Sequence, residues 1–319
     1  MPDQSSKSEG KMSTEFFSAP GTFFRGNLHT HSTLSDGVLE PAEVCRRYKD
    51  EGYDFIALTD HMLGQYNHPI ADTRDFRSAD FTTIIGAELH SGAQENGELW
   101  HILAVGLPFD FEPTASHDFF ADPAQETGPE LAKRAMDAGA HVSIAHPQWS
   151  GLTQSDVESI TNAHAVEAYN HGCAIGADRA DGFHSLEQLL EQGRRINLIA
   201  TDDAHFSEPD HFGGWVMVKA TENDPDALLE NLKAGNYYSS QGPEIKNITI
   251  TDTEIVVESS AITAMVVMAH GNLAKAHHGL SMTRSSLPLS WFSASPYIRI
   301  SIMDAAGRKA WSNPIWLDA

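Results

Sequence analysis

The feature that most constrains the fold of this chain is an alternation of short apolar runs with helix-like segments over its first two thirds. Each run has four to six residues and is mostly apolar on both faces, as expected of strands buried in a parallel sheet. Helix signals lie between them, because 41–51 begins with a proline, and 129–137 and 185–192 each end within two residues of a glycine. Seven runs follow the pattern, at residues 24–28, 55–59, 83–87, 100–105, 141–145, 165–169 and 196–200.

Seven strands that alternate with helices predict an α/β fold, a closed or nearly closed barrel. The longer connections 62–81 and 107–128 are rich in Pro, Asp and Gly, and we expect them to be loops over one mouth of that barrel. After residue 215 the pattern changes to a strand, a helix and then apolar segments separated by turn residues, which indicates antiparallel strands. We therefore expect three parts: a flexible leader over residues 1–22, a barrel over 23–244 and a small β-sandwich-like domain over 245–319.

Charge and composition exclude several classes of protein. The chain has 319 residues, with 44 acidic against 21 basic side chains and a net charge of −23. A field of this sign repels long nucleic acids, which are bound through rows of Lys and Arg. No apolar run approaches the ~18 residues that cross a bilayer, and the first residues have no signal-peptide pattern. We expect a soluble, cytoplasmic protein that does not contact membranes.

Metal-binding side chains gather at the predicted strand ends. His29 and His31 follow the first strand, and alternate residues of an extended segment point to the same side. Active sites of α/β barrels form at the carboxyl ends of strands, and buried ionisable groups are costly unless they are paired or bound to metal. The sequence therefore predicts a metal site from nine side chains: His29, His31, Asp36, His61, Glu88, His101, His146, Asp203 and His205.

Eight of these nine residues, all except His101, fall into a series of short motifs. The motifs are His29-x-His31-Ser32-x-x-Ser35-Asp36-Gly37, Thr59-Asp60-His61, Gly86-x-Glu88, Ala145-His146-Pro147 and Asp203-x-His205. In order and spacing, over about residues 25–205, the series resembles that of the polymerase and histidinol phosphatase (PHP) family. The resemblance implies a distorted seven-stranded barrel, a trinuclear centre of Zn, Mn or Fe, and cleavage of phosphoesters.

The resemblance also implies a division of the ligands. The first metal would take His29, His31, Glu88 and Asp203, the second would take Glu88, His101 and His146, and the third would take Asp36, His61 and His205. Some members of the family have His at the position of Asp36, and an oxygen ligand there favours Mn or Fe. A water that bridges two divalent ions is acidified to hydroxide near neutral pH. We expect Glu88, Asp203 and His146 to hold that hydroxide.

The substrate stays open between two kinds of reaction. Residues 215–218, 238–243 and 310–316 resemble a PHP branch with a C-terminal β domain, which includes carbaryl (carbamate) hydrolases. Our first hypothesis is a phosphoesterase acting on a small phosphorylated metabolite or nucleotide, and the second is a carbamate, ester or amide hydrolase. A metal-binding regulatory barrel without catalysis and a nuclease are further alternatives. The C-terminal domain is expected to be a rigid support or a dimerisation surface, which would make the protein a homo-oligomer.

Substrate contacts are expected from the loop after the sixth strand. Arg179 can bind a phosphate through two N–H groups, and His184 lies near the same loop. The alternative for Arg179 is an exposed pair with Asp178 or Asp181.

Other polar residues near the motifs are assigned supporting roles or none. Asp60 and Asp202 are expected to orient ligand imidazoles, and the Asp-x-His spacing favours Asp203 over Asp202 as a ligand. The remaining histidines near the motifs are treated as non-ligands, including His90, which lies two residues after Glu88.

Overall fold

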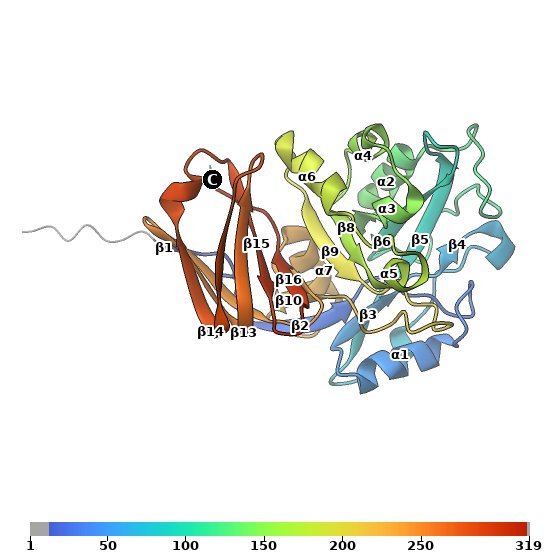
Figure 1. Cartoon of the computed structure of the whole chain (residues 1–319). Coiled ribbons are helices and arrows are strands. Elements are labelled where there is room, and N and C mark those ends of the chain that lie inside the picture. The colour runs from blue at the N-terminus through green and yellow to red at the C-terminus, as the bar shows by residue number, and fades with distance from the viewer. Residues whose placement is uncertain (1–12, 318–319) are drawn as a thin grey trace, which may run out of the picture.

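The computed structural model describes residues 13–317, and its strands belong to one continuous hydrogen-bonded system. Figure 1 shows two portions, an α/β portion with all the α-helices and a portion of long antiparallel strands from the C-terminal part of the chain. The predicted α/β class of the first portion is confirmed. The strands of this portion are β2 (Thr22–Asn27), β3 (Phe55–Leu58), β4 (His61–Met62), β5 (Thr82–Ala93), β6 (Leu99–Val105), β7 (His141–Ile144), β8 (Ala165–Asn170) and β9 (Asn197–Thr201).

Strand pairing brings the carboxyl ends of these strands to one edge. The order of pairing is β2, β3, β5, β6, β7, β8, β9, and the pairs β2–β3, β3–β5, β7–β8 and β8–β9 are parallel. Just beyond β2 and β9, Thr30 and Ala204 form a parallel bridge. The first and last strands of the series therefore meet at the edge where the predicted ligands lie.

One strand runs against the parallel pattern. β6 is antiparallel to both β5 and β7, because residues 94–98 join β5 to β6 as a turn and not through a helix. As a result the beginning of β6 lies beside the end of β5, and His90 is the cross-strand partner of His101. A residue near the start of a strand thus reaches the edge formed by strand ends.

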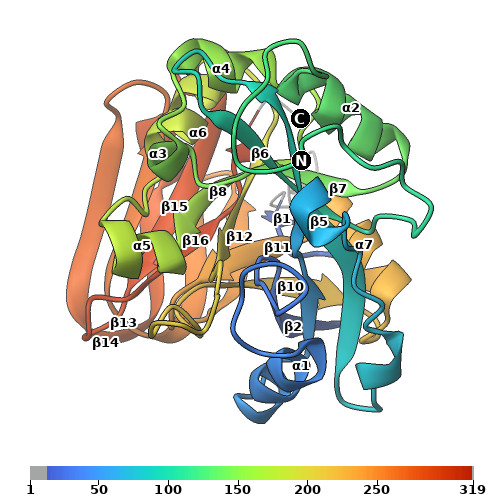
Figure 2. The same cartoon turned by 90° about the vertical axis from the view of Figure 1, so that its right-hand side faces the viewer.

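The starts of the helices coincide with capping residues in the sequence. α2 begins with a capping box between Thr127 and Glu130, and the Asp224 side chain accepts from two backbone N–H groups at the start of α7. Figure 2 shows the helices at the periphery of the α/β strands. No helix within residues 13–317 is long and apolar enough to cross a membrane. The helices are α1 (Pro41–Asp50), α2 (Gly128–Asp137), α3 (Pro147–Ser150), α4 (Gln154–Ser159), α5 (His171–Ala177), α6 (Phe183–Glu191) and α7 (Pro225–Ala234), with 3-10 turns at Gly64–Tyr66, Arg74–Phe76 and Leu289–Phe292.

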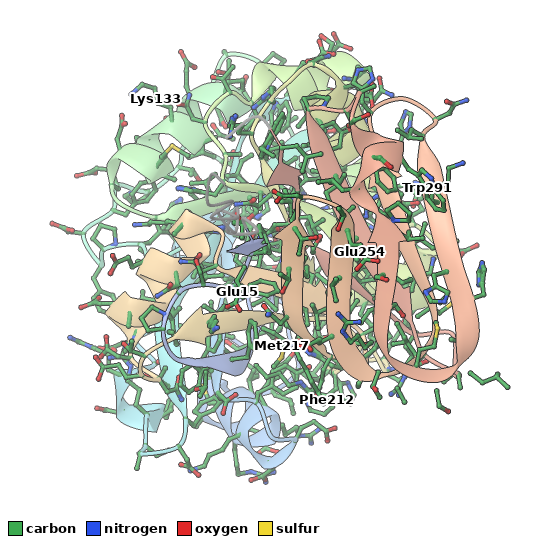
Figure 3. All side chains as sticks on the ribbon, turned by 90° about the vertical axis from the view of Figure 1, so that its left-hand side faces the viewer. Glu15, Lys133, Phe212, Met217, Glu254 and Trp291 are labelled. Atoms are coloured by element: carbon green, nitrogen blue, oxygen red, sulfur yellow. The ribbon has the colours of Figure 1, made fainter. Side chains whose placement is uncertain are left out.

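The later strands are antiparallel, as predicted. β13 is the centre of this portion and pairs with β12, β14 and β15, and their apolar side chains form a separate core that includes Met265 and Ile300. Trp291, which Figure 3 labels, lies in the 3-10 turn Leu289–Phe292 that follows β14 and is 48% exposed. The strands are β10 (Trp215–Ala220), β11 (Tyr237–Ser240), β12 (Ile245–Thr251), β13 (Glu254–Ala269), β14 (Ala274–Pro288), β15 (Tyr297–Met303), β16 (Lys309–Ser312) and β17 (Ile315–Trp316).

The prediction of a flexible leader through residue 22 is wrong for its second half. β1 (Ser13–Glu15) pairs antiparallel with β12, and Phe17 is 2% exposed in the core of the C-terminal strands. The rings of Phe17 and Phe23 are 5.1 Å apart, which gives this otherwise polar segment apolar surface to bury. Residues 1–12, the rest of the predicted leader, lie outside the described part of the chain.

Candidate metal centre

The structure brings all nine predicted ligands together at the edge where the strands end. His29 and His31 follow β2, Asp203 and His205 follow β9, and His146 follows β7. The others come from β4, β5, β6 and the loop after His31. Within this set, ligand atoms converge to within 4.8 Å of one another in several groups of three or four residues.

Glu88 is the centre of the cluster and is fully buried. Its Oε1 lies 2.8 Å from His101 Nδ1 and 3.1 Å from His146 Nε2. Its Oε2 lies 2.7 Å from His61 Nδ1 and 3.5 Å from His29 Nε2. One carboxylate therefore faces imidazoles from four separate segments, an arrangement suited to bridging two cations.

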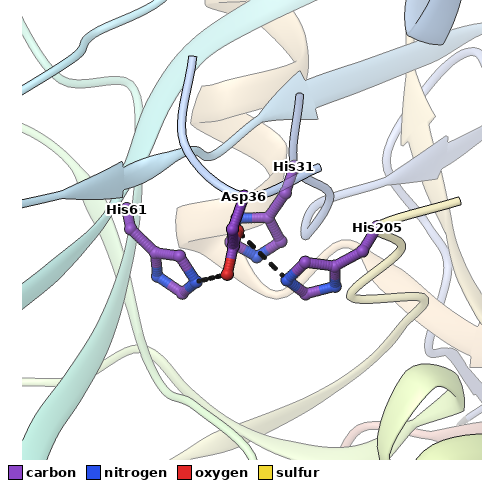
Figure 4. Close-up of side chains that lie close together, drawn as sticks. All are labelled: His31, Asp36, His61 and His205. Atoms are coloured by element: carbon purple, nitrogen blue, oxygen red, sulfur yellow. Dashed lines mark ion pairs between the residues drawn. The ribbon is translucent and has the colours of Figure 1, made fainter. Parts of the chain in front are cut away.

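Asp36 organises the other end of the cluster. Its Oδ2 lies 3.4 Å from His61 Nε2 and its Oδ1 lies 3.3 Å from His205 Nε2. Figure 4 shows these two imidazoles on either side of the carboxylate, with His31 close by. Asp203 joins this end to the first, because its Oδ1 lies 3.0 Å from His31 Nε2 and 3.2 Å from His29 Nε2.

The charges of the cluster are strongly coupled. Burial lowers the pKa of His61, but Glu88 and Asp36 outweigh burial and raise it to about 10. Burial likewise lowers the pKa of His205, while Asp36 and Asp203 raise it to about 9. Burial and these neighbouring imidazoles lower the pKa of His31 to about 4. Protons on some imidazoles thus balance the carboxylates, in places where metal cations would do the same.

The donor set fits divalent metals. Within the cluster, three buried atoms make no hydrogen bond to the described residues, namely His29 Nε2, His31 Nδ1 and Glu88 Oε2, although Glu88 Oε2 lies close to His61 Nδ1. Buried polar atoms are almost always paired, so three such atoms in one cluster indicate a missing partner. Imidazole nitrogens and carboxylate oxygens are the usual ligands of Zn, Mn and Fe, and a cation would satisfy all three atoms.

Glu167 supports two of the predicted ligands. It is fully buried, its Oε1 lies 2.8 Å from His29 Nδ1, and its Oε2 accepts from the backbone N–H of His146 at 2.6 Å. Asn170 Nδ2 donates to the same Oε2 at 2.9 Å. A carboxylate on the far nitrogen of an imidazole fixes the tautomer and the orientation of a ligand.

The prediction that Asp60 and Asp202 orient imidazoles is wrong. Asp60 Oδ1 accepts from the backbone N–H of Ser32 and from Ser35 Oγ, both at 2.7 Å, so it holds the loop that carries Asp36. Asp202 accepts from Tyr48 Oη and from three backbone N–H groups of residues 212–214. These segments contain N–H donors that need acceptors, and the two carboxylates satisfy them.

His90, which was predicted to be a non-ligand, lies inside the cluster. His90 is fully buried, and its Nε2 lies 2.8 Å from His61 Nδ1. Its Nδ1 lies 3.2 Å from the carbonyl oxygen of Trp100, which can only accept, so Nδ1 carries the proton and Nε2 is the acceptor. The sequence contained a signal for this position, because residues i and i+2 of a strand, here Glu88 and His90, share a face.

Two of the nine residues have unusual backbone conformations. His146 has φ of 23° and Asp203 has φ of 55°, in the region that residues other than glycine rarely adopt. Such conformations persist only where surrounding contacts hold them, and they are frequent at functional sites. The Glu167 bond to the His146 N–H, and a bond from the Asp203 N–H to the His29 carbonyl at 2.8 Å, are contacts of this kind.

The cluster opens onto two cavities on either side of Trp149. One, of about 500 Å³, includes His101 and Arg179 in its wall, and the other, of about 240 Å³, includes Asp203 and His205. Trp149 lines both. Arg179 therefore lines the same cavity as His101, and its contact with a substrate stays a prediction.

His184, the other predicted substrate contact, is not brought to the cluster. It is exposed on α6 and is not among the residues that line either cavity. The 107–128 connection does reach the site as a covering loop, because the ring of Phe119 lies 4.9 Å from that of His61.

Comparisons with known proteins find several similar chains. An uncharacterized protein of Methanocaldococcus jannaschii is 25% identical over 214 residues, which cover 65% of this chain and 85% of that protein. The 5'-3' exoribonuclease Rnm of Salmonella typhimurium is 30% identical over 172 residues, 53% of this chain and about half (54%) of that enzyme. A two-domain protein of Bacteroides vulgatus, described as containing a predicted PHP-like metal-dependent phosphoesterase, has a TM-score of 0.49 at 15% identity and covers 93% of this chain and 92% of its own.

A family match covers most of the cluster. The PHP domain matches residues 27–193, just over half of the chain, and this segment contains seven of the nine residues. Asp203 and His205 follow it in the sequence, and the Thr30–Ala204 bridge places them beside His29 and His31. The chain belongs to the PHP domain family.

Proposed function

We propose that this protein is a metal-dependent phosphoesterase that hydrolyses a small phosphorylated metabolite or nucleotide at a centre of three divalent metals. The observation that carries the proposal is the set of three unpartnered buried atoms, which belong to His29, His31 and Glu88 and lie within a cluster of nine coordinating side chains. Family membership supports the same chemistry, because members of the PHP family mostly cleave phosphoesters.

The proposal assigns each ligand to a metal, with Mn, Zn or Fe as the candidates. His29, His31, Glu88 and Asp203 would hold the first, Glu88, His101 and His146 the second, and Asp36, His61 and His205 the third. The distances around Glu88 and Asp36 support this division, since Glu88 faces the first two sets and Asp36 faces two imidazoles of the third. The short contact between His61 Nδ1 and Glu88 Oε2 connects the third set to the others.

The contribution of the chain itself to the reaction is positional. When bound, the metals would acidify a water into the nucleophile and neutralise charge that develops on the phosphoryl oxygens. Glu88, Asp203 and His146 converge from three strand ends and would fix where that nucleophile stands. Glu167 holds His29 and His146 in place, and Phe119 lies over His61, where it limits the access of bulk water.

We also propose the division of the chain into a seven-stranded barrel over residues 23–244 and a supporting domain over 245–319. Contacts of Asn313 are evidence that the C-terminal domain supports the barrel. Its Oδ1 accepts from the Leu198 N–H of β9, and its Nδ2 donates to the Tyr237 carbonyl. Trp311 packs into the core of the α/β portion. Dimerisation through this domain would appear as twice the chain mass in analytical ultracentrifugation, and a monomer would exclude it.

The test of the function compares three chromogenic esters in the presence of added Mn: p-nitrophenyl phosphate, the p-nitrophenyl diester of thymidine monophosphate, and p-nitrophenyl acetate. Wild type and Asp203→Asn are assayed side by side, because Asp203 faces both His29 and His31. We expect phosphate ester cleavage by the wild type and its loss in the variant. Absence of phosphate ester cleavage with Mn, Zn and Fe alike would reject the proposal.

Two other outcomes would change the proposed reaction or the proposed substrate. Acetate cleavage alone, lost in Asp203→Asn, would indicate the carbamate and ester hydrolase alternative. A single-stranded oligonucleotide belongs in the same plate, because the Salmonella relative is a 5'-3' exoribonuclease. The net charge of −23 favours a small substrate over a long strand.

A further inference from the structure

The 500 Å³ cavity beside the cluster is placed to hold the part of a substrate that does not react. His101 belongs both to the metal cluster and to the wall of this cavity, so a phosphoester bound at the metals would extend its alcohol portion into it. The volume lies in the range of small-molecule sites. This inference rests on the proposed function for the position of the reacting group.

Two aromatic side chains flank His101 and remain partly open. Phe119 is 39% exposed and Trp149 is 42% exposed, and both line the cavity. The Phe119 ring lies 6.4 Å from the His101 ring at an angle of 15°, and the Trp149 ring lies 5.5 Å from it at 70°. Large apolar side chains that stay exposed inside a functional cavity are typical of surfaces that a ligand covers.

The remaining wall is polar and contains one cation. Arg179 is exposed, and its guanidinium has no ion-pair partner among residues 13–317, so the alternative of a pair with Asp178 or Asp181 is not what the structure shows. Gln94, Glu98 and Ser150 add an amide, a carboxylate and a hydroxyl to the same wall, where Gln94 Nε2 already donates to the Leu99 carbonyl and Ser150 Oγ already contacts His146 Nδ1. A purely hydrocarbon ring would leave the Arg179 guanidinium without a partner, whereas a ring with polar edges would pair with it.

We propose that Phe119 and Trp149 form a stacking subsite that selects phosphoesters carrying a planar aromatic group with polar edges, such as a nucleobase. The phosphoryl group lies at the metals, the ring packs against the two aromatic side chains, and Arg179 donates hydrogen bonds to acceptors on the ligand. The same chemistry can come from a free nucleotide or from the terminal nucleotide of a strand.

The test uses two substrates with the same reacting ester. Adenosine 5'-monophosphate and ribose 5-phosphate both lose phosphate from a primary sugar oxygen, and only the nucleotide carries a base. We expect kcat/KM to be about tenfold higher for the nucleotide, because stacking of one base contributes roughly a 5- to 150-fold effect. Phe119→Leu and Trp149→Leu should remove most of this difference through KM, because they lower kcat/KM for the nucleotide much more than for ribose 5-phosphate.

Matched controls come from exposed aromatic residues outside the cavity. Phe120 is 83% exposed and Trp291 is 48% exposed, and neither lines the cavity, so Phe120→Leu and Trp291→Leu should not change the ratio of the two substrates. A short oligonucleotide in parallel distinguishes the two sources of nucleotide, since its preferred cleavage would assign the subsite to strand ends. Equal kcat/KM for both small substrates in the wild type, or equal loss of both in the Leu variants, would overturn the proposal.

Failure of the proposed function gives a different result. If no phosphate ester is cleaved, binding of adenosine 5'-monophosphate to wild type, Phe119→Leu and Trp149→Leu is measured by isothermal titration calorimetry with Mn present. Binding that weakens at least fivefold in both variants would support the subsite without the reaction. Binding that is absent in the wild type, or unchanged in the variants, would overturn it.

Discussion

Replacement of Glu167 by Gln should weaken metal binding without changing a single predicted ligand. The carboxylate Oε1 lies 2.8 Å from His29 Nδ1, and its Oε2 accepts from the His146 N–H at 2.6 Å and from Asn170 Nδ2 at 2.9 Å. A glutamine retains one acceptor oxygen and places an NH₂ group against one of these donors. One substitution therefore loosens two ligands, His29 and His146.

The magnitude follows from this double contact. Loss of a supporting hydrogen bond to a metal-bound imidazole lowers metal affinity about 10- to 100-fold. We expect Glu167→Gln to lower metal affinity by an amount near the upper end of this range, about 100-fold or 2.7 kcal/mol of binding free energy. The substitution affects ligands of two metals, which is why the larger loss is expected. Affinity is measured by equilibrating metal-free protein in metal-buffered Mn and counting metal per chain by mass spectrometry.

The control for this variant is Glu126→Gln. Glu126 pairs with Arg134 on α2 and contacts none of the nine residues, so the same chemical change there should leave metal affinity unchanged. Circular dichroism would establish that both variants are folded. Wild-type Mn affinity in folded Glu167→Gln would refute the positional role assigned to this carboxylate.

Three further predictions follow from the same structure. His90→Leu should weaken metal binding only about tenfold, because His61 Nδ1 still lies 2.7 Å from the charged Glu88 Oε2, and an unchanged metal count would contradict this. Burial, together with His164 and Lys233, holds the pKa of His141 well below its ordinary value, so the folded protein resists protonation there and stability falls as pH drops below about 6.5. Between pH 7 and 5 the free energy of unfolding should fall by up to about 2 kcal/mol more in wild type than in His141→Phe, by urea titration. Removal of metal by a chelator should lower the thermal midpoint, and Mn at about 100 times its Kd should restore about 2.7 kcal/mol per site; an unaffected midpoint would argue against metal binding by the folded state alone.

Strand ends were the predictable part of this site. The apolar runs and the residues that follow them place His29, His146 and Asp203 at one edge, because carboxyl ends of parallel strands meet there. His101 reaches the same edge for a different reason, since β6 is antiparallel and presents its beginning. His101 lies outside the motif series, and strand direction could not be read from an apolar run alone.

Contacts that depend on loops were less predictable. Asp60 and Asp202 lie beside ligands in the sequence, yet they bond loop N–H groups whose position depends on tertiary structure. Phe119 reaches the cluster from a connection without periodicity, so no pattern indicated its contact with His61. Sequence proximity to a motif is therefore a weak guide to which ligand a polar side chain supports.

The C-terminal strands show a related limit. Among the strands of residues 13–317, β14 pairs only with β13, and it is exposed along most of its length, so its sequence lacks the apolar alternation by which half-buried strands are recognised. The buried stretches of β13 do have an apolar pattern, because 254–258 and 264–269 bury their apolar residues against β12 and β15. Burial on at least one face is what makes a strand visible in the sequence.

The contrast between buried strands and exposed loops also separates the residues of the metal cluster from those that would select the substrate. Glu88 lies on β5 and is fully buried, whereas the side chain of Asp36 lies on a loop and is 34% exposed. The sheet thus fixes the buried part of the cluster, and Glu88 lies within the segment that matches the PHP domain. The residues that would meet the substrate, Phe119, Trp149 and Arg179, lie on a loop, a short helix and a helix end. Because insertions and substitutions are tolerated in such segments, one metal cluster can serve different esters, and substrate assignment must come from the walls of the cavity and not from the ligands.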